Sequence, residues 1–185
     1  MNNERKMHYI LTICLIIVLR LSDLGVTYLY TRDLAYEWNP LVSQLGAGWT
    51  TMLIIQSLIV AFITVLAYFY FSREELRIET PGLSFNEFIY VYFFGKLHPI
   101  KERAFHLPTD YKRVLAHNGF VFTVVAIVIS LFAVINNLLI VNRIAVYEQF
   151  VLRYQSVYFP LVMMGVALLT INWFFVIEYR RYRKQ

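Results

Sequence analysis

The sequence predicts an all-α, polytopic membrane protein with four transmembrane helices in a single membrane domain, residues 1–185. Hydrophobic residues make up 59% of the chain and charged residues only 16%, whereas soluble domains carry about 25% charge. The apolar residues are gathered in four blocks and do not alternate with polar residues at a helical or strand period. The basic residues fall mainly on one side of these blocks. Water is therefore not the main solvent of this chain.

The four blocks have the length of membrane spans. A helix needs about 20 residues to cross about 30 Å of hydrocarbon at 1.5 Å per residue. One such block could be a buried helix of a soluble protein, but four in one short chain argue against that interpretation. The predicted transmembrane helices cover about 8–30, 49–71, 119–141 and 158–177.

The first block could instead be a cleaved signal peptide, because Arg5 and Lys6 precede it. It is too long for the apolar region of such a peptide, it contains Arg20 and Asp23, and it lacks an A-x-A-like cleavage site. We expect it to remain as a helix.

The basic residues predict the orientation, because Lys and Arg in short loops stay on the cytoplasmic side. The opposite loops hold only Arg32, Arg143 and Arg153. We therefore expect a multi-pass protein of the cell (inner) membrane with both termini cytoplasmic. The net charge of +5 then favours anionic lipid and not nucleic acid. Thirteen basic residues lie on the cytoplasmic side in this topology: Arg5, Lys6, Arg73, Arg77, Lys96, Lys101, Arg103, Lys112, Arg113, Arg180, Arg181, Arg183 and Lys184.

The cytoplasmic segment 72–118 contains one clear helix start. Ser84 and Glu87 have the spacing of a capping box before the aromatic stretch 88–94. Because this stretch is too short to span a membrane, we expect an amphipathic segment at the membrane interface.

Further short elements are predicted on both sides of the membrane. Pro99 can open a second short helix that Pro108 ends, and Thr109 can cap a helix that continues into the third crossing. On the outer side, helical spacing predicts a surface-lying amphipathic turn from Ile144, Tyr147, Val151 and Tyr154.

Polar residues inside the spans predict a polar layer. Arg20 and Asp23 are three residues apart and can neutralise each other, and Thr27 continues their face. Asp23 lies about 10 Å below the outer end of its helix, and Gln56 on the second helix has a similar depth. Asn136 and Asn137 on the third helix are slightly shallower. These groups could join the helices by hydrogen bonds or form a ligand or ion site, and both alternatives stay open.

A short motif resembles a known signature. Asp23-x3-Thr27, followed by Glu37-x-Asn39-Pro40-Leu41, is similar to the signature of an uncharacterised family of small bacterial and archaeal multi-pass membrane proteins. The resemblance covers the first third of the chain and implies no activity.

The turn has a physical interpretation of its own. Pro40 moves Asn39 out of helical geometry, which suits a turn or cap before the second helix. The Glu37 carboxylate could face Asp23 and, with Thr27 between them, bind a cation, a proton or an amine headgroup. Alternatively, Glu37 caps backbone amides at the start of the second helix.

A second set of candidate ligands is cytoplasmic. On one continuous helix, two imidazoles and two carboxylates spaced four residues apart could bind a metal, but Pro108 interrupts the helix. A solvated interfacial face is the alternative that we favour. The four residues are His98, Glu102, His106 and Asp110.

Catalytic motifs are not visible. The chain has no G-x-S-x-G and no glycine-rich phosphate loop, so we expect no cofactor and no ATPase or dehydrogenase activity. The single cysteine, Cys14, is expected to serve in packing.

Three functional hypotheses follow. We favour a non-enzymatic membrane subunit or accessory protein that docks to a membrane-protein partner or forms a homo-oligomer. One alternative is a small channel, transporter component or proton-linked protein that uses Asp23 and Glu37. The other is a membrane-embedded enzyme acting on lipid.

Overall fold

All regular secondary structure in the described residues is helical. The computed structural model describes residues 1–34, 46–73, 78, 80–97, 108, 110–142 and 144–184. Four helices are long and apolar enough to cross a membrane, so the predicted four-helix membrane architecture is confirmed. The helices are α1 (Asn3–Tyr30), α3 (Trp49–Ser72), α4 (Phe85–Phe94), α5 (Tyr111–Val141) and α6 (Ala145–Tyr182).

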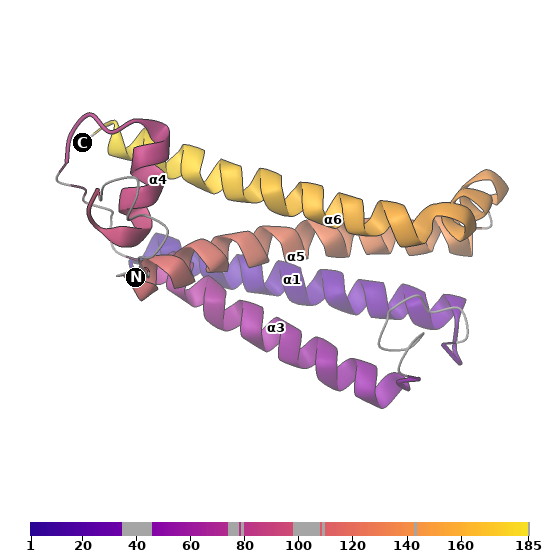
Figure 1. Ribbon diagram of the computed structural model, residues 1–185. Helices are drawn as coiled ribbons and strands as arrows, with labels where there is room; N and C mark the ends of the chain where they lie inside the picture. Colours follow the sequence, from indigo (N-terminus) through magenta and orange to yellow (C-terminus); the bar gives the residue numbers. More distant parts are fainter. Residues whose placement is uncertain are drawn as a thin grey trace.

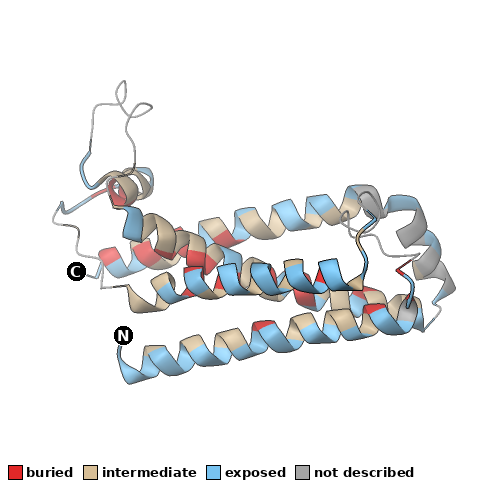
Figure 2. Cartoon of the chain, turned by 90° about the horizontal axis from the view of Figure 1, so that it is seen from below, coloured by how far each residue is buried: buried red, intermediate tan, exposed pale blue. Residues whose placement is uncertain are grey.

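Helix α5 is the centre of the bundle. It packs against α1, α3 and α6, and α1 also packs against α3. Both chain termini and the short helix α4 lie at one end of the bundle (Figure 1). The outward faces of the long helices are mostly exposed (Figure 2), as expected of surfaces that contact lipid.

The helices extend beyond the predicted spans. Helix α1 begins at Asn3, where the side chain of Asn2 accepts a hydrogen bond from the Arg5 amide at 2.9 Å. The predicted continuity into the third crossing is confirmed, with Asp110 as the cap of α5. Thr109, the predicted cap, lies outside the described residues.

Helix α6 corrects one prediction. The expected surface-lying turn around Tyr147 is not a separate element, because its residues belong to the first turns of α6. Pro160 lies inside this helix without ending it, which membrane helices tolerate because neighbouring groups satisfy the freed carbonyl.

Helices α3 and α5 approach each other closely at Gly119. A Cβ atom at this position would overlap the backbone carbonyl of Leu66 and also meet the side chain of Tyr70. Small residues allow such backbone contact between membrane helices. Gly119 therefore sets the distance between α3 and α5.

Aromatic pairs mark both ends of the spans. The rings of Tyr9 and Tyr68 lie 6.2 Å apart at the end with the termini, and those of Tyr28 and Trp49 lie 5.5 Å apart at the other end. Tyr28 follows Tyr9 by nineteen positions, and Tyr68 follows Trp49 by nineteen, which corresponds to about 28 Å of helix. This distance matches the thickness of the hydrocarbon core, about 30 Å, whose boundaries are enriched in Tyr and Trp.

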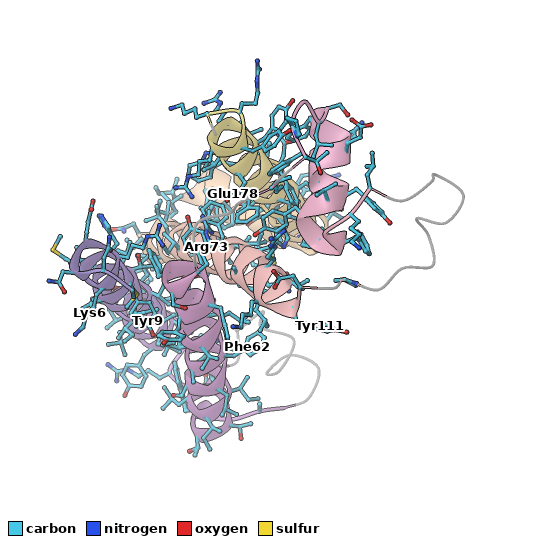
Figure 3. The ribbon with its side chains drawn as sticks, turned by 90° about the vertical axis from the view of Figure 1, so that its left-hand side faces the viewer. Lys6, Tyr9, Phe62, Arg73, Tyr111 and Glu178 are labelled. Atoms are coloured by element: carbon cyan, nitrogen blue, oxygen red, sulfur yellow. The ribbon has the colours of Figure 1, made fainter. Side chains whose placement is uncertain are left out.

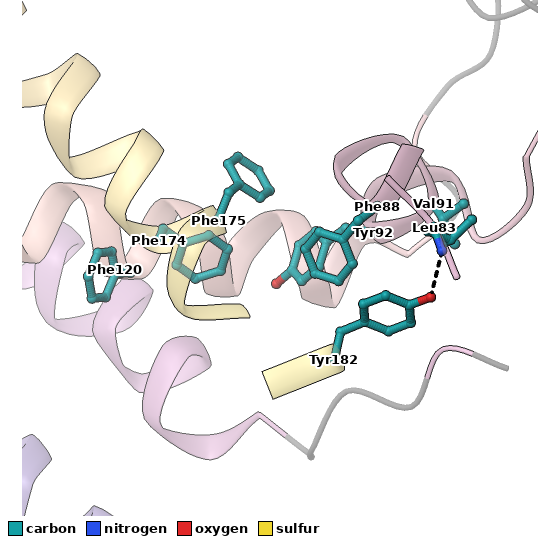
Figure 4. Packing of buried hydrophobic residues seen from close by; sticks show 8 residues of the cluster. All are labelled: Leu83, Phe88, Val91, Tyr92, Phe120, Phe174, Phe175 and Tyr182. Carbon is teal, nitrogen blue, oxygen red and sulfur yellow. Dashed lines mark hydrogen bonds between the residues drawn. The ribbon is translucent and has the colours of Figure 1, made fainter. Parts of the chain in front are cut away.

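Helix α4 begins as predicted, but much of its aromatic surface packs against the chain itself. The capping box of Ser84 and Glu87 is present, and Gly95 ends the helix with φ 72°. Phe88 and Tyr92 are buried against Phe174, Phe175 and Tyr182 of α6 (Figure 4). The expected interfacial segment is therefore in large part an internal contact of the chain.

Candidate functional site

Two polar sites lie at opposite ends of the bundle. The first joins α1 to α5 and contains predicted residues. The Nδ2 atom of Asn137 donates to Asp23 Oδ1 and to Thr27 Oγ1, both at 3.1 Å. Thr27 is 6% exposed, so these contacts form away from water.

Helix α6 completes this site through two tyrosines. Asn136 donates from Nδ2 to Asn137 Oδ1 at 3.1 Å. Its own Oδ1 accepts from the hydroxyl groups of Tyr147 at 2.6 Å and Tyr158 at 3.1 Å. We call this set the amide network: Asp23, Thr27, Asn136, Asn137, Tyr147 and Tyr158.

Sequence reasoning missed the role of both tyrosines. The sequence predicts Tyr147 in an amphipathic surface turn and Tyr158 at the end of a span. Tyrosine at a span end ordinarily anchors the interface, so their residue type carried no special signal. Both tyrosines belong to one continuous helix, α6. The sequence pattern does not predict this continuity.

Arg20 extends the amide network on α1. Its Nη1 lies 3.8 Å from Asp23 Oδ2, and both side chains are 18% exposed. The two carboxylate oxygens of Asp23 therefore face different partners, Arg20 and Asn137. The amide group of Asn137 donates to one oxygen lone pair of Asp23 and to one of Thr27. A cation at this place would need these lone pairs as ligands. This arrangement favours a hydrogen-bonded layer over a cation site.

One predicted residue that the structure describes, Gln56, makes no described contact with this network. Gln56 on α3 has its Oε1 buried, with no hydrogen-bond partner among the described residues. Arg20 Nε is in the same situation within that part of the chain. Glu37 and Asn39 lie outside the described residues, so their proposed role at the mouth of the bundle stays a prediction.

The second polar site lies at the end with the termini and was missed by sequence reasoning. Arg73, directly after α3, donates from Nη2 to Glu178 Oε1 at 2.7 Å, and Arg181 donates from Nη1 to the same oxygen at 2.9 Å. Arg5 donates from Nη1 to the Arg73 carbonyl at 2.7 Å. We call this set the guanidinium cluster: Arg5, Arg73, Glu178 and Arg181.

Aromatic rings surround the guanidinium cluster. The Arg73 guanidinium lies 4.0 Å from the ring centroid of Tyr70 and 5.5 Å from that of Phe174, as in cation–π contacts. Burial raises the pKa of Tyr92, so its hydroxyl stays neutral beside these charges. A signal was available, because Arg73 and Glu178 each follow a predicted span and therefore lie at similar depth.

The predicted metal ligands are not shown together. His98, Glu102 and His106 lie outside the described residues. Asp110 caps α5 and its Oδ2 lies 2.9 Å from Arg113 Nε. No group of three possible metal-ligating side chains occurs within the described ranges.

Cys14 also departs from its expected role. Its side chain is exposed on α1, where we expected packing inside the bundle.

No family model, curated protein or solved structure matches this chain.

Proposed function

We propose that the protein is a non-enzymatic membrane subunit that assembles with a second copy of itself through α1. The observation that carries this proposal is the exposed apolar stripe along α1. Only 11% of the residues in the apolar 18-residue stretch of α1 are buried, the smallest share among the four spans. The buried side of α4, which we expected at the membrane interface, packs on α6.

The stripe on α1 has the spacing of a helix–helix seam. Its members recur at alternating steps of four and three residues, and all are exposed. A repeat of 3.5 residues keeps one face towards a partner helix in left-handed packing. Two copies of one stripe can meet around a two-fold axis. The stripe consists of Met7, Leu11, Cys14, Val18, Leu21, Gly25 and Tyr28.

The acidic groups support a structural role. Asp23 is held by Arg20 and Asn137, Glu178 by Arg73 and Arg181, and Asp110 caps α5. Each of these carboxylates serves a contact between or within helices. They therefore stabilise the bundle, which is the function expected in a scaffold subunit.

Cys14 provides the test, because it is the single cysteine and lies in the middle of the stripe. Mild oxidation of membranes should produce a disulfide-linked dimer, since a symmetric α1 pair brings the two Cys14 residues together. The matched control carries Cys14→Ser with Leu58→Cys, which places the thiol on the exposed face of α3 (Leu58 63% exposed). This variant should stay monomeric on a non-reducing gel. Absence of the Cys14 dimer, together with a monomeric mass in mild detergent, contradicts self-assembly through α1.

The distribution of charged residues supports a cytoplasmic position for both termini. Residues 1–8, 72–118 and 178–185 contain thirteen basic and eight acidic residues, whereas the rest of the chain contains four of each. In the predicted topology these segments and the termini share one side and carry the whole net charge, which favours the cytoplasmic side. A cytoplasmic reporter should be active when fused after Gln185 or inserted near Pro81 and inactive near Gln44. Activity at Gln44 contradicts this orientation.

A second candidate function is an ion- or proton-linked membrane component. It is favoured by the buried polar atoms Arg20 Nε and Gln56 Oε1, which have no partner in the described part of the chain. In liposomes, flux that Asp23→Asn abolishes supports this candidate. Equal flux with both proteins, at the level of empty liposomes, argues against it.

A further inference from the structure

The guanidinium cluster gathers positive charge from three helices. Arg5 lies on α1, Arg73 follows α3 and Arg181 lies on α6. The carboxylate at their centre, Glu178, has a side chain that is only 3% exposed. Its single negative charge is shared by Arg73 and Arg181, so the cluster keeps an excess of positive charge.

One arginine of the cluster is exposed, and another keeps a buried donor without a described partner. Arg181 uses Nη1 for Glu178, and its side chain is 56% exposed. Arg73 Nη1 is buried and has no hydrogen-bond partner among the described residues. In the end view, Arg73 lies between Lys6 of α1 and Glu178 of α6 (Figure 3). Two further basic groups, Lys6 and Arg180, belong to the same end of these helices.

The depth of the cluster matches that of phospholipid headgroups. Tyr9 follows Arg5 by four positions and therefore lies about 6 Å further along α1 towards the middle of the span. The Tyr9 ring contacts Tyr68 and Phe71 near the end of α3. Such aromatic groups mark the boundary of the hydrocarbon, so the guanidinium groups lie on its polar side. Phosphate groups of lipids occupy this layer.

We propose that the guanidinium cluster binds the phosphate of an anionic phospholipid at the junction of α1, α3 and α6. Guanidinium groups match phosphate oxygens through paired N–H donors, and basic sites between transmembrane helices suit anionic headgroups. The acyl chains lie along the exposed apolar face of α6. This site does not depend on self-assembly through α1.

The test is a lipid titration of the purified protein in a neutral detergent. Phosphatidylglycerol should raise the thermal stability at a concentration at least about fivefold lower than phosphatidylcholine, the difference expected of one basic contact to an anionic headgroup. Arg181→Gln should require at least about fivefold more phosphatidylglycerol, while the contact of Arg73 with Glu178 stays in place. High salt should weaken the effect.

Arg183→Gln is the matched control, because it removes the same charge from an exposed residue two positions away. It should change the required phosphatidylglycerol concentration by less than about twofold. Equal losses in Arg181→Gln and Arg183→Gln overturn a localised site. Equal stabilisation by both lipids overturns recognition of the anionic headgroup, and equal stabilisation by soluble glycerol phosphate assigns the cluster to a free phosphate.

Discussion

The amide network and the guanidinium cluster hold the helices by different chemistry. In the amide network, neutral amide and hydroxyl groups make the short contacts, and the charged pair of Arg20 and Asp23 is separated by 3.8 Å. In the guanidinium cluster, charged groups meet directly at 2.7 and 2.9 Å. Depth explains the difference, because charge is expensive within hydrocarbon and is better solvated at the headgroup layer.

The two sites should therefore differ in how much one substitution costs. Hydrogen bonds between membrane helices contribute about 0.6 to 2 kcal/mol each. Removing one partner of a buried ion pair costs about 3–5 kcal/mol, because it leaves the other charge without compensation. Stability of the purified protein, measured by unfolding in mixed SDS micelles, can test this order.

The largest effect is expected from Glu178→Ala in the guanidinium cluster. This change leaves the largely buried Arg73 without its carboxylate, so the free energy of unfolding should fall by about 3–5 kcal/mol. The double variant Arg73→Gln with Glu178→Gln should recover a large part of this loss, because no unpaired charge remains. Wild-type stability of Glu178→Ala contradicts the assigned ion pair.

A smaller loss is expected from Asn137→Leu in the amide network. The change removes both hydrogen bonds to α1 and the acceptor for Asn136, and should cost about 1–3 kcal/mol. Asn142→Leu is the control, because Asn142 is an exposed residue at the end of α5 whose described hydrogen bonds stay within its own helix. A loss in Asn142→Leu as large as in Asn137→Leu contradicts a special role of the network.

The sequence predicts the four spans because hydropathy is a strong signal over about 20 residues. The sequence underestimates the length of the helices, since polar residues such as Asn3 and Glu4 continue a helix outside the hydrocarbon. The pattern around Tyr147 predicts a separate turn, although its residues continue into α6, which also accommodates Pro160. The capping box predicts the start of α4, but periodicity alone cannot tell lipid from protein as the partner of an apolar face.

The two sites also differ in how far the sequence predicts them. Asp23, Thr27, Asn136 and Asn137 are visible in the sequence because polar groups inside apolar spans are rare. For the guanidinium cluster the sequence gives only the similar depth of Arg73 and Glu178, because basic and aromatic residues are ordinary at span ends. Its contacts depend on the rotation of α3 and α6 about their axes, which composition does not define.

An effect of about 1 kcal/mol is expected from Tyr182→Phe at the α4 side of the bundle. The Tyr182 hydroxyl accepts from the Leu83 amide at 2.9 Å and donates to the Thr80 carbonyl at 2.8 Å, while its ring packs on Phe88 (Figure 4). The variant keeps the ring, so it should increase amide exchange of the segment before α4 without unfolding the bundle. Tyr154→Phe, at an exposed position on the opposite end, should leave that segment unchanged. Unaltered exchange in Tyr182→Phe contradicts this anchor.

The smallest effect is expected from Gln56→Leu, and it sharpens the distinction between stabilisation and function. Because Gln56 Oε1 is buried without a partner in the described residues, a leucine of similar size removes an unsatisfied group and should leave stability unchanged or raise it by up to about 1 kcal/mol. Asn137→Leu is the comparison, since the same type of change should lower stability there. If Gln56→Leu lowers stability as much, Gln56 is a member of the network in the folded protein. If it preserves stability but abolishes liposome flux, the polar layer serves the ion-linked function and the proposal of a purely structural subunit is wrong.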